Sequence, residues 1–188
     1  MGKDNERRRN WKLGKQAAFN CYSRTRKEIK KAKIQKQGLS CQKIEKILNC
    51  SKSFIGCFAS NQLETLSITC FPCTLIVNTD HTGTPGTHWI CFRISKQRIE
   101  MFDSLGLLYD NKLPKELLVF IQRFSVTRLF KFNERLQPDS SLLCGFYCIC
   151  FIFLRQYCSF RSIQSYFDDN LVANDDLIIK FFKYQCKF

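Results

Sequence analysis

A cysteine, a histidine and an aspartate lie at the ends of predicted secondary-structure elements. Cys144 begins a long apolar stretch that predicts a helix, and a polar stretch that starts at Gln137 leads into it. His88 opens one predicted strand, and Asp103 follows the next. A thiol gains nucleophilic character from a helix N-terminus and from a neighbouring imidazolium. These residue types in these places are the parts of a cysteine hydrolase.

Each of these residues has a chemical part in such a mechanism. An imidazole at His88 is the candidate base for Cys144, and a carboxylate at Asp103 would orient the ring and stabilise its charged form. The backbone N–H of Cys144 and the side-chain amide of Gln137 are candidate donors for an oxyanion hole. Gly145 has no side chain, so a substrate backbone could approach the nucleophile closely there.

Each residue also has a purely structural interpretation. The chain has 12 cysteines, so Cys144 could be a buried core thiol, and His88 could be a hydrogen-bonding residue at a strand end. Asp103 could be a turn residue ahead of Gly106, and Gln137 could be a loop amide. The residues by themselves leave both interpretations open.

The strands that would position these residues predict an α+β fold with a central mixed, largely antiparallel sheet. The apolar run 73–78 predicts a strand that is buried on both faces. Residues 88–94 and 98–102 predict two strands joined by a tight turn, and hence an antiparallel hairpin. A further edge strand is expected over 127–132.

Helices are expected to flank this sheet. Ser40 is a candidate N-cap for a short amphipathic helix, and Pro114 takes the first position of a helix that reaches Phe124. Residues 144–157 are apolar nearly all round, which predicts a central buried helix with the candidate nucleophile at its start. Asn174 and the acidic residues after it predict the cap of a final helix.

Positive charge is concentrated near the N-terminus. The 188-residue chain has a net charge of +14, and residues 1–50 contribute +11 of it, with 15 Lys/Arg against 4 Asp/Glu. Such a block is typical of a mobile segment unless a polyanion orders it. We therefore expect residues 1–38 to form a disordered basic tail and residues 39–188 to form the folded domain. The tail could contact nucleic acid, or it could be a solubilising arm or a nuclear-import signal.

Other kinds of site are weakly indicated. Cys70 and Cys73 form a CxxC pair without a second pair at ligand spacing, so no metal is expected. Residues 1–15 do not resemble a signal peptide, and reduced thiols are therefore expected. Residues 142–154 are apolar but too few to span a membrane. Residues 38–55 also admit a helix-turn-helix interpretation.

Four motifs in this order resemble a known family. They are His88-Trp89, Phe102-Asp-Ser-Leu-Gly106, Gln137 and Cys144-Gly145. Their arrangement resembles the adenovirus-type cysteine endopeptidases and the related ubiquitin-like-protein proteases.

Further segments are most similar to the proteases of Polinton (Maverick) virus-like transposons. These segments are 54–63, 72–80, 85–89, 159–163 and 174–176, so the resemblance runs from about residue 39 to residue 188. It implies a papain-like, adenovirus-protease-type fold, and it favours a first protease helix after Ser40 over a helix-turn-helix.

The resemblance also implies a role for each motif residue. It assigns the general base to His88, the orienting acid to Asp103, the nucleophile to Cys144, an oxyanion-hole donor to Gln137, and substrate contacts to Trp89 and Gly145. The acid is Asp, whereas adenovirus enzymes usually have Glu. No cysteine lies between Asp103 and Cys144, where the adenovirus enzymes carry the thiol that links to an activating peptide, so activation of that kind is not expected here.

The expected function is that of a thiol endopeptidase that cuts after small residues, of the Gly-Gly or Gly-X-Gly type. It would mature capsid or virion precursors of a virus or virus-like transposon, as a monomer in the host nucleus or the virion. Candidate stimulators are DNA and a peptide activator, with no other cofactor and no membrane partner expected. One alternative is a protease for ubiquitin or a ubiquitin-like modifier. An alternative of another class is a nucleic-acid-binding protein with an inactive protease fold.

Overall fold

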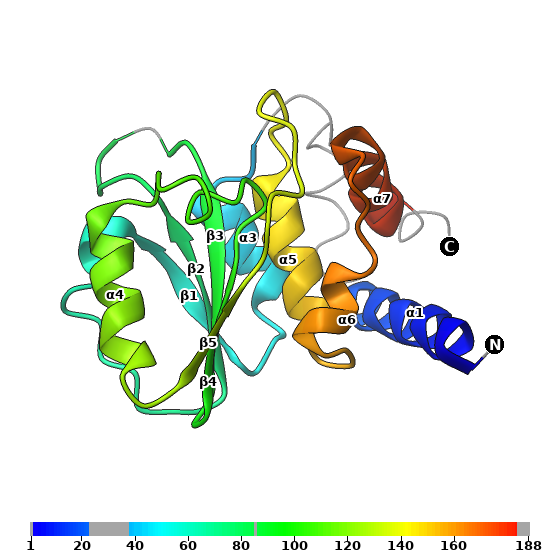
Figure 1. Cartoon of the computed structure of the whole chain (residues 1–188), viewed down its shortest axis with the longest axis horizontal. Coiled ribbons are helices and arrows are strands. Elements are labelled where there is room, and N and C mark those ends of the chain that lie inside the picture. The colour runs from blue at the N-terminus through cyan, green and yellow to red at the C-terminus, as the bar shows by residue number, and fades with distance from the viewer. Residues whose placement is uncertain (1, 23–37, 85, 184–188) are drawn as a thin grey trace.

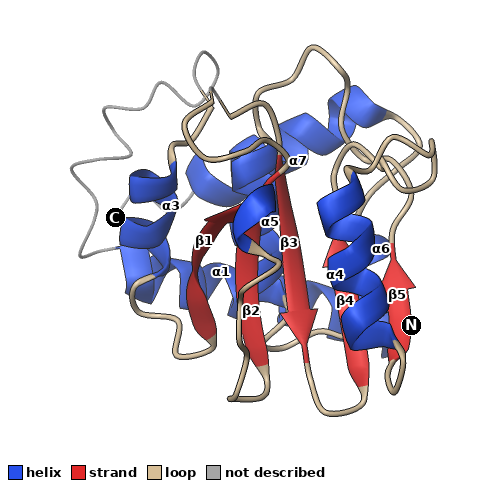
Figure 2. Cartoon of the chain, turned by 90° about the vertical axis from the view of Figure 1, so that its left-hand side faces the viewer, coloured by secondary structure: helices blue, strands red, loops and turns tan. Residues whose placement is uncertain are grey.

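A computed structural model describes residues 2–22, 38–84 and 86–183 of the chain. It is an α+β fold built on one five-stranded sheet, as the sequence predicts, and helices cover both faces of the sheet (Figures 1 and 2). The strands are β1 (Phe54–Ala59), β2 (Cys73–Asn78), β3 (Trp89–Ile94), β4 (Arg98–Phe102) and β5 (Leu129–Phe132). The helices are α1 (Gly2–Tyr22), α3 (Cys41–Leu48), α4 (Lys115–Ser125), α5 (Cys144–Leu154), α6 (Phe160–Gln164) and α7 (Leu171–Lys183), with a short 3-10 turn, η1 (Ser60–Gln62).

The sheet contains both parallel and antiparallel strand pairs, and its strands lie in the order β1-β2-β3-β4-β5. The central strand β3 runs antiparallel to both of its neighbours, β2 and β4, whereas each edge strand pairs in parallel with its neighbour. The predicted strands at 73–78 and 98–102 are confirmed, and β3 and β5 begin one and two residues later than expected. The hairpin of β3 and β4 brings the start of one strand and the end of the other to the same edge of the sheet.

Strand β1 was not predicted from the sequence. It contains Gly56 at a φ of 136° and pairs in parallel with β2, a partner that lies distant in the chain. A six-residue segment with a central glycine gives little local strand signal. Because residues 54–59 form a strand, the helix-turn-helix interpretation of residues 38–55 is wrong.

Alternation along the strands creates a core on each face of the sheet. Leu75 and Val77 point into the core beneath α4, whereas Ile76 between them packs in the core that contains α5. In Figure 2, α4 lies in front of the strands and α1 passes behind them. Strand β2 is therefore buried on both faces, as its continuous apolar run predicts.

Helix α5 is the buried central helix that the sequence predicts, although it ends at Leu154 rather than at residue 157. Every residue in it is buried, and Phe151 stacks on Phe102 of β4 at a ring-centroid distance of 4.5 Å. Immediately after α5, Arg155 donates two hydrogen bonds of 2.8 and 2.9 Å to the fully buried carboxylate of Glu100. This bidentate pair fixes α5 against the strand that leads into Asp103.

The N-terminal segment differs from the expectation of disorder. Residues 2–22 form α1, in which Trp11 packs against Tyr166 and Phe181 at centroid distances of 4.9 and 5.2 Å. Gly14 lies against Leu154, so close that a Cβ atom would come within 2.5 Å of its Cδ2 atom. One aromatic residue and one glycine in a charged segment give little indication in the sequence that the segment forms a helix packed on the domain. Residues 23–37 lie outside the described residues, so disorder there stays a prediction.

Two helix caps differ from those predicted. Pro114 is the N-cap residue of α4 rather than its first residue. The cap of α7 is Asn170, whose side-chain oxygen accepts from the backbone N–H groups of Val172 and Ala173. Asn174 is instead buried within the helix. Ser40 caps α3 as predicted.

Nine cysteines in the described part of the chain are free thiols, namely Cys41, Cys57, Cys70, Cys73, Cys91, Cys144, Cys148, Cys150 and Cys158. Cys50 is disulfide-bonded, so the expectation of reduced thiols is wrong for this residue. Within residues 2–22, 38–84 and 86–183, no helix combines the length and apolar character that a membrane span requires.

Candidate active site

The three residues predicted to do chemistry come together at one edge of the sheet. His88 immediately precedes β3, Asp103 immediately follows β4, and Cys144 is the first residue of α5. The side chains of His88 and Asp103 are almost completely buried, and Cys144 is 7% exposed. The ends of two strands and of one helix thus bring three polar side chains together in a largely buried site.

Two backbone N–H groups hold the carboxylate of Asp103 in place, independently of the histidine. Its Oδ1 accepts the backbone N–H of Leu105 at 2.9 Å, and its Oδ2 accepts that of Leu107 at 2.7 Å. The turn that supplies these donors depends on Gly106, which has a φ of 68° and lies so close to Arg135 that a Cβ atom would be 2.8 Å from its backbone nitrogen.

A buried asparagine fixes the backbone of the same residue. Asn133 accepts the N–H of Asp103 at 2.9 Å and donates to its carbonyl oxygen at 2.7 Å. Both backbone groups of Asp103 are therefore satisfied by one side chain that follows β5. This clamp leaves the carboxylate pointing at His88, where Oδ1 lies 2.7 Å from Nε2.

His88 lies between this carboxylate and the thiol. Burial lowers the pKa of His88, but hydrogen bonds with Asp103 and Cys144 and the charges of both groups outweigh it, so the pKa rises to about 9. Because Nε2 is bonded to Asp103, Nδ1 is the ring nitrogen left for the Cys144 sulfur. A protonated ring at neutral pH stabilises a thiolate beside it.

The raised pKa of His88 predicts a pH-dependent contribution to stability. A folded-state value of about 9 against 6.5 stabilises the fold by on the order of 3 kcal/mol below about pH 6.5. This contribution is lost as the pH rises from about 6.5 through about 9. The wild type should therefore lose, between about pH 6 and pH 10, an advantage of this size over His88→Gln in urea-unfolding experiments.

The chain's other histidine provides the control. His81 is exposed and contacts Glu116 on the surface. The variant His81→Gln should keep the pH dependence of the wild type. If the stabilities of the wild type and His88→Gln stay parallel across this pH range, the ring does not hold its proton through Asp103 and Cys144.

Gln137 lies close beneath the site, with its amide already engaged. Its Oε1 accepts from Ser104 Oγ at 2.5 Å, and its Nε2 donates to the carbonyl of Ser141 at 2.8 Å. The side chain is 1% exposed. An amide nitrogen has two hydrogens, and the bond to Ser141 uses one of them. A role for Gln137 in an oxyanion hole stays a prediction.

The start of α5 carries donors of its own. No side chain caps this helix at Leu143, so its first N–H groups, including that of Cys144, are not satisfied by a capping residue. The positive end of the helix dipole points at the place where negative charge would develop. The local structure therefore suits either a thiolate or an oxyanion.

Gly145 and Trp89 are packed together. A Cβ atom on Gly145 would lie 3.1 Å from Leu39 Cβ and 3.3 Å from Trp89 Cδ1. The indole N–H of Trp89 donates to the carbonyl of Leu39 at 2.8 Å. The absence of a side chain at Gly145 thus serves packing against the segment before α3. Substrate contact by Gly145 or Trp89 stays a prediction.

An open cleft of about 610 Å³ gives access to the thiol. Its walls come from the start of α3, the turn before β3 and the loop before α5. The lining residues include Leu39, Cys41, Asn78, Thr87, His88, Trp89, Ser141, Leu142 and Cys144. The candidate nucleophile Cys144 and the candidate base His88 thus both line the cleft, whereas Asp103 and Gln137 are not among its lining residues.

Several supporting residues were not predicted. Asn133 could not be recognised from local sequence, because its partner Asp103 lies distant in the chain. Ser141 could not be recognised either, because it contributes its backbone carbonyl rather than its side chain. Leu39 was predicted only as part of a helix start. Ser104 lies inside the motif Phe102-Asp-Ser-Leu-Gly106, and its polar side chain next to Asp103 could have indicated a supporting role.

The comparisons with known proteins give a limited result. No family model matches the chain, and no curated protein matches it. ChlaDub1 from Chlamydia trachomatis is similar in structure, with a TM-score of 0.39 and 19% identity, over 61% of this chain and 58% of that one. The central domain of Lpg1148 from Legionella pneumophila has a TM-score of 0.41 and 14% identity, over 70% and 86%.

The chain thus spans 58% of the length of the ChlaDub1 chain that it matches. Likenesses of this degree do not carry a functional conclusion. They do not link the chain to the adenovirus-type or Polinton proteases, so that resemblance stays a prediction.

Proposed function

We propose that the protein is a cysteine peptidase. The observation that carries the proposal is the position of His88, which bonds Asp103 at 2.7 Å and interacts with the Cys144 thiol, and both His88 and Cys144 line an open cleft. A buried carboxylate, an imidazole and a sulfur in this order are the parts of a thiol-protease triad.

The mechanism follows from the places of these groups. The Cys144 sulfur attacks the scissile carbonyl carbon, and His88 gives its proton to the leaving amine as the C–N bond breaks. Water then attacks the thioester while His88 takes a proton from it, which releases the acid product and restores the thiol. Asp103 keeps the ring in one orientation and stabilises its charged form. N–H groups at the start of α5 stabilise the oxyanion, with Gln137 as a second donor.

The substrate proposed is a protein cut after small residues, of the Gly-Gly or Gly-X-Gly type. The resemblance of the motifs supports this choice and supports the maturation of capsid precursors as the biological role. The same resemblance supports stimulation by nucleic acid through the basic N-terminal residues. On α1, Arg8, Arg9 and Lys12 are exposed and could meet phosphates.

The test uses the reduced full-length chain and two substrate sets. One set is internally quenched peptides with a central Gly-Gly or Gly-X-Gly, and the other is ubiquitin and ubiquitin-like modifiers with a fluorogenic group at the C-terminus. Each is assayed with and without duplex DNA. We expect hydrolysis of the peptides, and iodoacetamide should label Cys144 first, as mass spectrometry of the labelled peptide would show.

The other outcomes discriminate between alternatives. Hydrolysis of the modifier substrates alone would indicate a ubiquitin-type protease. Among the cysteines that the structure describes, Cys70 is an exposed thiol that competes for iodoacetamide, whereas burial raises the pKa of Cys148 and Cys150 and disfavours their reaction. Absence of hydrolysis, with label on Cys70 and none on Cys144, would reject the peptidase proposal and leave a nucleic-acid-binding protein with an inactive fold as the alternative.

A further inference from the structure

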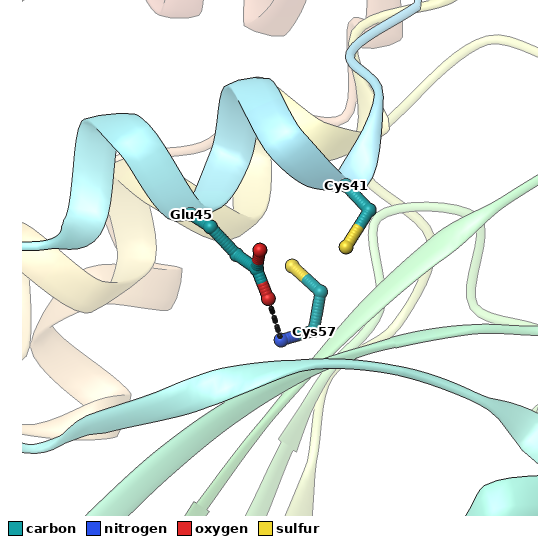
Figure 3. A group of neighbouring side chains, drawn as sticks. All are labelled: Cys41, Glu45 and Cys57. Atoms are coloured by element: carbon teal, nitrogen blue, oxygen red, sulfur yellow. Dashed lines mark hydrogen bonds between the residues drawn. The ribbon is translucent and has the colours of Figure 1, made fainter.

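Two thiols and a carboxylate meet between α3 and β1, outside the candidate triad. They belong to Cys41 and Glu45 of α3 and to Cys57 of β1, and their ligand atoms all lie within 4.8 Å of one another. Figure 3 shows the three side chains converging on the space between the helix and the strand. Each of these residue types is a common ligand of zinc.

The secondary structure explains the convergence. Cys41 and Glu45 are four residues apart on α3, so both lie on the helix face that packs over β1. Cys57 lies on that strand, and its backbone N–H donates to Glu45 Oε1 at 3.3 Å. This bond holds the carboxylate with its second oxygen available to a ligand (Figure 3).

We propose that Cys41, Glu45 and Cys57 bind a zinc ion, with solvent as the fourth ligand. The proposal departs from the sequence-based expectation that no metal is bound. The pattern of two thiols and a carboxylate comes from two elements that only the fold brings together, so it has no CxxC-type spacing that would reveal it.

The dimensions of the cluster suit a tetrahedral ion. With Zn–S distances of about 2.3 Å and Zn–O distances of about 2.1 Å, the ligand atoms of a tetrahedral site lie roughly 3.6–3.8 Å apart. Donor atoms within 4.8 Å of one another can reach this spacing by small rotations of the side chains. Thiolate ligands favour zinc over the hard cations magnesium and calcium.

Access and charge agree with this assignment. Glu45 is exposed and both thiols are partly exposed, so an ion and its fourth ligand can enter from solvent. On binding, a divalent cation would balance the negative charge of one carboxylate and two thiolates at this spacing.

The proposed ion would also stabilise a wall of the cleft. Leu39 and Cys41 line the cleft at the start of α3, and the carbonyl of Leu39 holds Trp89. Metal at this place would fix the start of α3 to β1 and so hold these lining residues. The site is distinct from the triad, and its test does not depend on peptidase activity.

The experiment titrates the reduced full-length chain with cobalt(II) and then with zinc. A Cys144→Ala background removes the reactive thiol that could otherwise bind metal with His88. We expect one cobalt per chain with sulfur-to-cobalt charge-transfer absorption, displaced by one zinc. The melting temperature should rise on zinc binding, because the ion binds the folded state.

Three variants make the test specific. Cys57→Ser should weaken binding by at least about 100-fold, since even the loss of supporting groups near a metal costs about 10- to 100-fold. Glu45→Gln keeps an acceptor for the Cys57 N–H and should weaken binding by about 10-fold with an unchanged circular dichroism spectrum. The double variant Cys70→Ser/Cys73→Ser removes the CxxC pair and should bind like the parent.

Two results would overturn the proposal. One is a sulfur-to-cobalt band that survives in both Cys57→Ser and Glu45→Gln, or that disappears in Cys70→Ser/Cys73→Ser. The other is the absence of metal binding by the parent; formation of a Cys41–Cys57 disulfide under mild oxidation would then make the pair a redox site.

Discussion

Replacement of Cys144 by alanine should lower kcat/KM for peptide hydrolysis by at least about 10⁴-fold, because Cys144 is the thiol that interacts with His88 and would form the covalent intermediate. The neighbouring groups would still bind substrate, so KM should change little. The loss should therefore appear in kcat, measured with the quenched Gly-Gly peptides. Labelling of Cys144 by iodoacetamide should disappear in the same variant.

The same helix offers a matched control. Cys150 is buried in α5 and lies near Lys15 of α1 rather than in the cleft. Cys150→Ala removes the same atom from the same helix and should keep most of the activity, with a modest loss of stability. If both variants were equally active, the nucleophile would not be Cys144 and the proposed function would be wrong.

Replacement of Asp103 by asparagine should lower kcat/KM by roughly 10³- to 10⁴-fold. The carboxylate accepts from His88 at 2.7 Å and is held by the backbone N–H groups of Leu105 and Leu107. An amide oxygen in the place of Oδ1 can keep the contacts with His88 and Leu105, but the amide loses the acceptor for Leu107 and removes the charge that favours the protonated ring. Burial of His88 would then lower its pKa without compensation from the carboxylate.

The pH profile separates this role from a merely structural one. In the wild type, kcat/KM should fall as the pH rises through about 9, where His88 loses its proton. In Asp103→Asn that fall should move to lower pH. Asp110→Asn changes an exposed carboxylate in the same loop and should keep the wild-type profile. An unshifted profile in Asp103→Asn would show that Asp103 does not act through the charge of His88.

Much of the fold could be predicted from local patterns. The apolar run of β2, the hairpin of β3 and β4, the N-cap at Ser40 and the buried α5 all depend on residues that are neighbours in sequence. The strand β1 and the helix α1 could not be predicted in this way. Their stability comes from a parallel partner strand and from Trp11 and Gly14 against distant residues, and such contacts leave little local signal.

The candidate site could likewise be predicted only in part. The sequence by itself determined that His88, Asp103 and Cys144 lie at the ends of a strand, a strand and a helix, because capping, turn and periodicity signals are local. Only the tertiary structure decided that these ends meet, that Asn133 clamps Asp103, and that Gln137 is bonded to Ser104 and Ser141.

The cluster of Cys41, Glu45 and Cys57 was likewise decided by the tertiary structure alone, since it requires α3 to pack on β1. The physical reason is common to all these cases. The sequence carries the conformational preference of each segment, whereas chemistry needs side chains from different segments within hydrogen-bonding or ligand distance. That distance is set by the packing of apolar faces, which is a property of the whole chain.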